Sequence, residues 1–227
     1  MTTFRQAPAL FTLIGINVFI FLAQNLGWDL RQQGALWLPE SQYYQSHQWL
    51  THLFLHDNLL HLLFNMYALG VLGRPLNTLL GNLKFLLLYL LSGLFAALFY
   101  LAYPLYLITF VSADLLNETQ TQLLIKLLFH SSMLGASGAV CGVAAAFAVC
   151  LPQARLGIIF LPFSLPARHF VLLFTAYELF AQFSGFSIFG NNIAHLAHVG
   201  GAIAGTIIAL FFQWHLRKKL LNHRSSV

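Results

Sequence analysis

Residues 135–142 have the sequence GASGAVCG and stand where a polar segment gives way to an apolar run. A serine between glycines at the start of an apolar helix has two interpretations. Ser137 is either a packing residue, since small side chains let membrane helices approach closely, or a nucleophile at a helix N-terminus. Free backbone N–H groups and the positive end of the helix dipole favour a developing oxyanion there. This segment alone favours packing, but residues 56–65 and 195–205 change the balance.

Composition indicates a membrane protein. The chain has 227 residues, of which 59% are hydrophobic and 7% charged, whereas soluble domains carry about 25% charged residues. Little room remains for a separate soluble domain, so we expect a single membrane domain over residues 1–227. The basic excess is modest and lies on one side of the membrane, which argues against a nucleic-acid-binding protein. The sequence predicts an all-α polytopic membrane protein.

Six segments are predicted to span the membrane, with both ends of the chain on the same side. Their approximate bounds are 8–26, 56–73, 83–103, 136–151, 168–184 and 194–215. The first is interpreted as a retained span, because no convincing small-x-small cleavage site follows it.

Charged residues set the expected orientation. Nine of the 11 Lys and Arg residues lie on the side that holds both termini, leaving Arg31 and Lys126 on the other. The positive-inside rule therefore predicts cytoplasmic termini. We expect no targeting extension, which favours the inner membrane of a bacterium.

The connections between spans also have expected structures. Residues 27–55 are rich in Trp and Tyr, as is typical of a membrane interface. The leucine spacing in residues 114–129 predicts a short helix lying on the membrane. Residues 157–165 are apolar but are interrupted by proline, and we interpret them as a surface loop.

The fourth span is short. A helix over residues 137–151 would measure about 22 Å at 1.5 Å per residue, against a hydrocarbon core of about 30 Å. Ser137 would then lie below the outer interface. Irregular backbone at that depth requires protein cover or access to water.

Polar residues within the second span lie on one face. His61 and Asn65 are four residues apart and therefore adjacent on a helix surface. Such side chains either make hydrogen bonds between helices or act as donors aimed at a shared anionic atom.

The sixth span carries a matching pattern. His198, Gly201 and Gly205 share one helix face, and the two glycines form a surface for close helix contact. Gly138 and Gly142 form a similar surface on the fourth span. If these surfaces meet, His198 comes within reach of the candidate serine and can take its proton.

Three residues near this pattern have open roles. Glu178, an acid in the fifth predicted span, would complete a triad, pair with a histidine, or face water. His195 is interpreted as an interface or loop-bonding residue. Cys141 is interpreted as a packing residue, with a thiol nucleophile as the alternative. The sequence has no zinc-type cluster.

Together, these segments resemble the rhomboid intramembrane serine proteases. The resemblance extends from about residue 49 to residue 205, with the six-span layout around it. The matching motifs are Gly135-x-Ser137-Gly138, His56…His61-x-x-x-Asn65 and Ala197-His198-x-x-Gly201.

The resemblance implies a role for each polar residue. Ser137 would be the nucleophile and His198 the general base and then the general acid. The oxyanion hole would consist of the Ser137 N–H with the His61 and Asn65 side chains. His56 would support the loop between spans 1 and 2, and the three motif glycines would support the site. No metal or organic cofactor is implied.

The chain departs from the family pattern in two places. Leu50 follows Trp49 where rhomboids often have Arg, which bears on loop anchoring. Cys141 stands where an aromatic residue is common. The connection 104–135 also looks long, and residues 183–192 would form the loop that gates substrate access.

The expected activity is hydrolysis of a peptide bond in or near a transmembrane helix of a membrane-protein substrate, within the lipid bilayer. One alternative is a non-catalytic relative that binds transmembrane helices, although such relatives usually lack the serine or the histidine. Another is a small transporter, which predicts repeats or discontinuous helices at the midplane. No repeat is visible.

Overall fold

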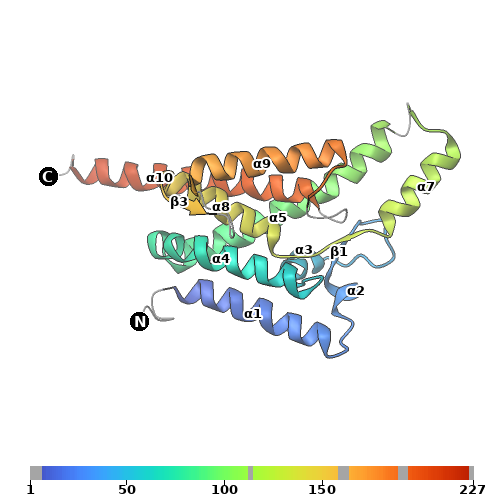
Figure 1. Ribbon diagram of the computed structural model, residues 1–227, viewed down its shortest axis with the longest axis horizontal. Helices are drawn as coiled ribbons and strands as arrows, with labels where there is room; N and C mark the ends of the chain where they lie inside the picture. The colour runs from blue at the N-terminus through green and yellow to red at the C-terminus, as the bar shows by residue number, and fades with distance from the viewer. Residues whose placement is uncertain (1–6, 112–114, 158–163, 189–193, 225–227) are drawn as a thin grey trace.

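The computed structural model describes residues 7–111, 115–157, 164–188 and 194–224. Long helices lie side by side, and the start of α1 and the end of α10 are at the same end of the molecule (Figure 1). The long helices are α1 Pro8–Asn25, α4 Leu59–Leu80, α5 Asn82–Tyr106, α8 Ser137–Cys150, α9 Ala167–Ser184 and α10 His195–Arg224. The shorter elements are α2 Leu30–Gly34, β1 Leu36–Trp37, α3 Gln48–Thr51, η2 His52–Phe54, η3 Leu107–Val111, α7 Glu118–Phe129, β2 Ser132–Met133, β3 Arg155–Gly157 and β4 Ser164–Pro166.

Among the described residues, four helical segments are long and apolar enough to cross a membrane. They are Pro8–Asn25, Leu59–Leu80, Asn82–Phe110 and His195–Leu216. The shorter apolar helix α8 and the more polar α9 are not among them. The chain is therefore a mostly helical, multi-pass membrane protein.

The helices match the predicted segments in place but differ in length. The second segment was expected to begin at residue 56, but α4 begins at Leu59, because the Asn58 side chain caps it by accepting a hydrogen bond from the His61 N–H at 2.9 Å. The same helix continues past residue 73 to Leu80 and includes Pro75. Gly81, with φ of 81°, then separates it from α5.

The apolar core is built around α8, which packs against α10, α5 and α4. Most of α8 is small, and its sequence SGAVCGVAAAFAVC lets neighbouring backbones approach. Large buried side chains such as Phe85, Leu88 and Tyr89 fill the space beside it. Many apolar side chains on the outer faces of α1, α4 and α10 are exposed, as expected for surfaces that face lipid.

Two short ladders tie the connections together. Strand β1 pairs antiparallel with β2, so the segment before α8 is joined to the connection between α1 and α4. Strands β3 and β4 form a second antiparallel pair where the sequence predicted only a loop. The central part of that predicted loop, residues 158–163, lies outside the described residues.

Helix α7 forms the expected short helix in the connection after α5, although it begins at Glu118 and not at residue 114. A capping box explains the start, because the Asn117 side chain accepts from the Gln120 N–H and the Gln120 side chain accepts from the Asn117 N–H. None of its residues is buried, and Leu123 and Leu127 are exposed. In Figure 1, α7 extends away from the other helices.

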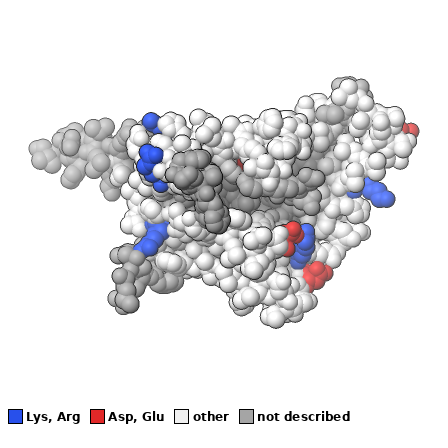
Figure 2. Space-filling model, viewed as in Figure 1, with Lys and Arg blue, Asp and Glu red and all other residues white. Residues whose placement is uncertain are grey.

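Charged side chains separate along the helix axes. In Figure 2, Lys and Arg gather at the end that holds the start of α1 and the end of α10. Asp and Glu appear towards the opposite end, with a few further basic side chains. This separation agrees with the charge asymmetry of the sequence.

Candidate functional site

Ser137 is the first residue of α8. The first backbone bond of this helix runs from the Val140 N–H to the Ala136 carbonyl at 2.9 Å. The N–H groups of residues 137–139 therefore precede the helical ladder, and the positive end of the helix dipole lies at the serine. A carbonyl oxygen that becomes negative beside Ser137 would meet a favourable field.

His198 lies against this serine. Its Nε2 is 2.8 Å from the Ser137 Oγ, although 61 residues separate them in the chain. The predicted glycine surfaces are in contact, because a β-carbon on Gly201 would collide with the Gly138 backbone and one on Gly205 with the Gly142 backbone. Close approach of α8 and α10 thus positions the histidine.

His61 packs against Gly135, the glycine two residues before the serine. A β-carbon on Gly135 would be 2.7 Å from the His61 Cε1 and 2.8 Å from its Nε2. Gly135 also has φ of 129°, a backbone conformation that residues other than glycine rarely adopt. Position 135 therefore requires glycine, both for its positive φ and because the His61 imidazole packs on it.

Asn65 is buried one turn further along α4. Its Nδ2 donates a hydrogen bond to the His61 backbone carbonyl at 2.9 Å. An amide nitrogen carries two protons, so one remains for another acceptor. The structure packs His61 against Gly135 and turns one Asn65 donor towards its own helix.

His56 is buried and contacts the His61 ring edge-on, with ring centroids 5.1 Å apart. Burial, and secondarily the charge of His61, lowers the pKa of His56 to about 3. Its backbone is held from α1, because the Gln24 side chain accepts from the His56 N–H and donates to the His56 carbonyl. His56 therefore fixes the start of α4 through its backbone and supports His61 through its ring.

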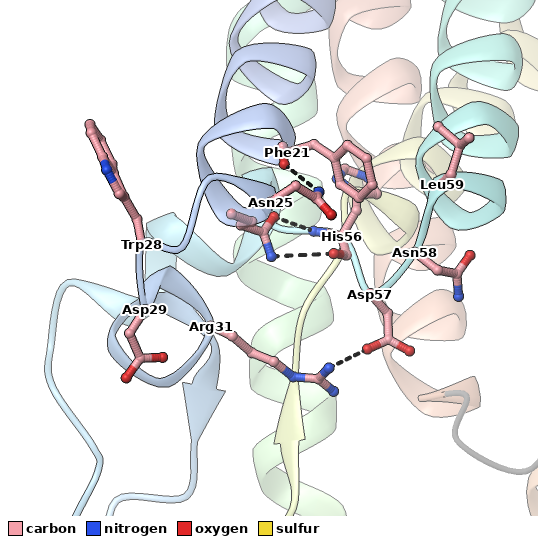
Figure 3. A pocket seen from close by; sticks show the side chains of 10 residues that line it. Phe21, Asn25, Trp28, Asp29, Arg31, His56, Asp57, Asn58 and Leu59 are labelled. Carbon is pink, nitrogen blue, oxygen red and sulfur yellow. Dashed lines mark hydrogen bonds and ion pairs between the residues drawn. The ribbon is translucent and has the colours of Figure 1, made fainter.

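A pocket of about 600 Å³ lies beside this contact. Figure 3 shows it between the end of α1 and the start of α4, with an ion pair of 2.6 Å between Arg31 and Asp57. Neither Ser137 nor His198 lines it, so this pocket is not where the serine is approached.

Gln48 and His52 were missed by the sequence analysis. Gln48 is fully buried, and its side chain donates to the carbonyls of Gln33 and Tyr43 and accepts from the Trp37 N–H. The His52 ring bonds the Gln48 carbonyl at 2.7 Å.

These two residues connect the loop between α1 and α4 to the site. The His52 carbonyl accepts from the Gly135 N–H at 2.9 Å, two residues before the serine. Burial lowers the pKa of His52 to about 4, so its ring is neutral near pH 7. Leu50, at the position where rhomboids often have Arg, is 49% exposed, and Gln48 anchors this loop through its hydrogen bonds. Nothing in the sequence marked Gln48, because its burial and its backbone partners exist only in the folded loop.

Glu178 lies behind His198. It is 1% exposed, so the interpretation that it faces water is wrong. Its Oε2 is 2.9 Å from the His198 Nδ1 and 2.7 Å from the His195 Nδ1. His195 is buried and belongs to this cluster, and not to an interface or loop as expected.

The same cluster has the donor atoms of a metal site. Glu178, His195 and His198 each offer one ligand atom, and these atoms lie within 4.8 Å of one another. Two imidazoles and one carboxylate suit a transition metal. Both imidazoles already hydrogen-bond the carboxylate, so the buried polar atoms have partners without an ion.

The expected gating loop, residues 183–192, follows α9. Gly185 ends that helix with φ of 70°, and Phe183 and Phe186 are exposed. Residues 189–193 lie outside the described residues.

Comparisons with known proteins agree with this geometry. A family model described as "Rhomboid domain" matches residues 42–215. The chain is 32% identical over 211 residues to "Rhomboid protease AarA" of Providencia stuartii, which covers 88% of this chain and 71% of that protein. It is 28% identical over 226 residues to "Rhomboid protein 1, mitochondrial" of Saccharomyces cerevisiae, covering 98% of this chain and 58% of that protein. A "Rhomboid protease GlpG" of Photorhabdus laumondii is 25% identical over 221 residues, covering 96% of this chain and 67% of that protein.

The family match extends over most of the chain and includes every residue of the serine and histidine cluster. The named relatives include proteins described as proteases from bacteria and a protein described as mitochondrial. With its multi-pass helical fold, the chain belongs to the rhomboid family of intramembrane proteases.

Proposed function

We propose that this chain is an intramembrane serine endopeptidase that cleaves transmembrane helices of membrane-protein substrates, with Ser137 as nucleophile and His198 as general base. The observation that carries the proposal is the 2.8 Å contact between the Ser137 Oγ and the His198 Nε2 at the N-terminus of α8. A hydroxyl needs an adjacent base to attack a peptide carbonyl at neutral pH.

The reaction has two stages. In the first, the Ser137 Oγ attacks the scissile carbonyl while His198 takes the hydroxyl proton, and His198 then gives this proton to the leaving amine. The product is an acyl-enzyme. In the second stage, a water molecule loses a proton to His198 and attacks the ester, which releases the acid and restores Ser137.

The oxyanion of each tetrahedral intermediate needs donors. The Ser137 N–H precedes the helical ladder of α8, and the His61 ring is packed beside Gly135. Asn65 has one amide proton beyond the bond to the His61 carbonyl. These three groups form the proposed oxyanion hole.

The substrate must present an unwound segment, because a helical carbonyl is hydrogen-bonded and shielded. By analogy with the family, a small residue precedes the scissile bond. Substrate reaches the serine past α9, whose Phe180 and Phe183 side chains are exposed.

We also propose one domain over residues 1–227, six spans with cytoplasmic termini, and a bacterial inner membrane as the location. The start of α1 and the end of α10 lie at the same end of the molecule, and basic side chains gather there, which supports this orientation (Figures 1 and 2). The bacterial proteins AarA and GlpG among the relatives support the location.

The test uses the purified full chain in liposomes with a fluorescent transmembrane substrate. The intact protein is compared with Ser137→Ala, His198→Ala and a control, Ser46→Ala, which removes an exposed serine hydroxyl. A fluorophosphonate probe, which phosphonylates an activated serine and releases fluoride, reports on the nucleophile without any substrate. Thermal unfolding in detergent reports on folding.

We expect Ser46→Ala to cleave and to react with the probe like the intact protein. Ser137→Ala and His198→Ala are expected to remain folded and to lose cleavage by at least about 10³-fold. Continued cleavage by folded Ser137→Ala would refute the proposal. Probe reaction at Ser137 without cleavage of any of several substrates would retain the nucleophile and reject the proposed substrate class.

A further inference from the structure

The candidate dyad has a buried carboxylate behind it. Glu178 is on α9, whereas His198 and Ser137 are on α10 and α8. The Glu178 side chain has a relative exposure of 2%. A carboxylate removed from water is stable only when other groups satisfy its charge and hydrogen bonds.

A continuous line of hydrogen bonds runs through the imidazole of His198. Its Nδ1 is 2.9 Å from the Glu178 Oε2, and its Nε2 is 2.8 Å from the Ser137 Oγ. When Nδ1 carries the proton and donates it to the carboxylate, Nε2 has its lone pair directed at the serine hydroxyl. This tautomer is the one that a general base requires.

His195 supplies a second hydrogen bond to the carboxylate. Its Nδ1 is 2.7 Å from the same Glu178 Oε2. A carboxylate oxygen has two lone pairs, so Oε2 can accept from both histidines at once. His195 and His198 are separated by one turn of α10, and the glutamate from α9 therefore spans two successive positions on that helix.

We propose that Glu178 is a positioning residue that turns the Ser137–His198 pair into a Ser–His–Glu triad, with His195 as the second donor that holds the carboxylate. The proposal rests on the serine-protease function proposed above. Glu178 fixes the tautomer and orientation of His198 and stabilises the imidazolium that forms when His198 takes the serine proton. No atom of Glu178 touches the substrate.

Other titratable groups near this cluster come from several helices. His61 on α4 interacts electrostatically with His198, and Cys141 on α8 with Glu178. Tyr177 on α9 faces the His195 ring edge-on. On α5, the Tyr100 hydroxyl bonds Ser131 and not the cluster. Among these groups, Glu178 is the one that bonds directly to the catalytic imidazole.

The decisive experiment compares the intact chain with Glu178→Gln in liposomes, with Glu40→Gln as the matched control because Glu40 is exposed. Cleavage is measured as kcat and KM from pH 5.5 to 9, and folding as Tm. Glutamine keeps the shape of glutamate but lacks the charge, and its amide can donate to His198 Nδ1 and impose the wrong tautomer.

We expect Glu178→Gln to lower kcat on the order of 10²-fold with little change in KM. The acidic limb of its kcat profile should move to lower pH by about one unit, because the imidazolium loses its counter-ion. Glu40→Gln is expected to match the intact chain. A kcat for Glu178→Gln within twofold, or an unmoved acidic limb, overturns the triad.

A second variant covers the case in which Glu178→Gln folds poorly. Glu178→Asp retains the charge but reaches less far, so kcat should fall while the acidic limb stays where it is in the intact chain. An Asp variant whose acidic limb moves to lower pH overturns the proposal. Failure of the triad is distinguishable from failure of the protease function, since the latter appears as cleavage by Ser137→Ala.

Discussion

Gly201 lies directly on the backbone of Gly138, where α10 crosses α8. These two glycines stand three residues after His198 and one residue after Ser137 in the sequence. Their contact therefore sets the distance between the nucleophile and its base. A methyl group on Gly201 would have to separate these two helices, whereas one on Gly138 would collide with Ala96 on α5.

The Gly201→Ala substitution tests this relationship. Its β-carbon would meet the Gly138 carbonyl, so we expect a destabilisation of about 1–3 kcal/mol and a loss of activity of about 10²-fold from the displaced imidazole. Tm and liposome cleavage measure the two effects. Gly15→Ala is the control, because its β-carbon would have nothing within 4 Å. Equal behaviour of the two variants would contradict the close-contact argument.

The oxyanion-hole assignment predicts the effect of His61→Ala. Removing this donor should lower kcat by about 10²–10³-fold, because the developing negative charge loses a preorganised hydrogen bond. Fluorescent substrate cleavage measures kcat, and Tm verifies folding. Leu60→Ala changes an exposed side chain in the same turn of α4 and should be close to the intact protein. If His61→Ala retained kcat within threefold, the imidazole would have no part in oxyanion binding.

Loop anchoring by Gln48 predicts a stability effect. Gln48→Ala leaves the Gln33 and Tyr43 carbonyls and the Trp37 N–H without this partner, which should cost about 1–3 kcal/mol. Activity should fall as well, because the same loop holds the Gly135 N–H through His52. Thermal unfolding provides the measurement. Leu50→Ala, which shortens a side chain that is 49% exposed, is expected to stay within about 0.5 kcal/mol. The reverse order would show that Gln48 does not anchor this loop.

Because two histidines before α4 are buried, we expect the stability of the protein to decrease as the pH is lowered. The folded-state pKa values of His52 and His56 are about 4 and about 3, below the ordinary value of 6.5. Around and below pH 6.5, the unfolded chain therefore binds more protons than the folded chain. The contribution of the two neutral histidines to the free energy of unfolding is full above pH 6.5 and is lost as the pH falls. By pH 4.5 the contribution lost at each histidine is on the order of 2–3 kcal/mol.

Thermal unfolding between pH 7.5 and 4.5 measures this loss. His56→Gln should flatten the dependence of Tm on pH, since glutamine does not titrate. His169→Gln, a change at an exposed histidine on α9, should leave the slope as it is in the intact protein. A slope that is the same in both variants would mean that His56 is not the group responsible.

Helix positions were predictable because each depends on local pattern. Apolar runs located α1, α5, α8 and α10, and glycine spacing identified the surfaces through which α8 and α10 could meet. Boundaries were less accurate where side-chain caps decide them, as Asn58 does for α4 and Asn117 for α7. The ladder between β1 and β2 could not be anticipated, because two-residue strands carry no periodic signal.

The candidate site also contains residues that the sequence indicated and residues that it did not. Ser137, His198 and His61 lie on three different helices, so their spacing alone could not bring them together. The sequence placed His198 near Ser137 only if the glycine surfaces met, and the contact of α8 with α10 supplies that condition. Gln48 was missed because its partners are backbone groups of residues 33, 37 and 43, which only the folded loop brings together.

By itself, the sequence determined that the chain is a membrane protein, because hydropathy and charge asymmetry are properties of the linear chain. Its three motifs carried the resemblance to the rhomboid family, which the family match confirms. Only the tertiary structure decided the place of Glu178. Its sequence position allowed a triad, a histidine pair or exposure to water. The packing of α9 against α10 removed water from the carboxylate and left two imidazole nitrogens as its partners. A buried charge takes whichever donors the fold puts within reach.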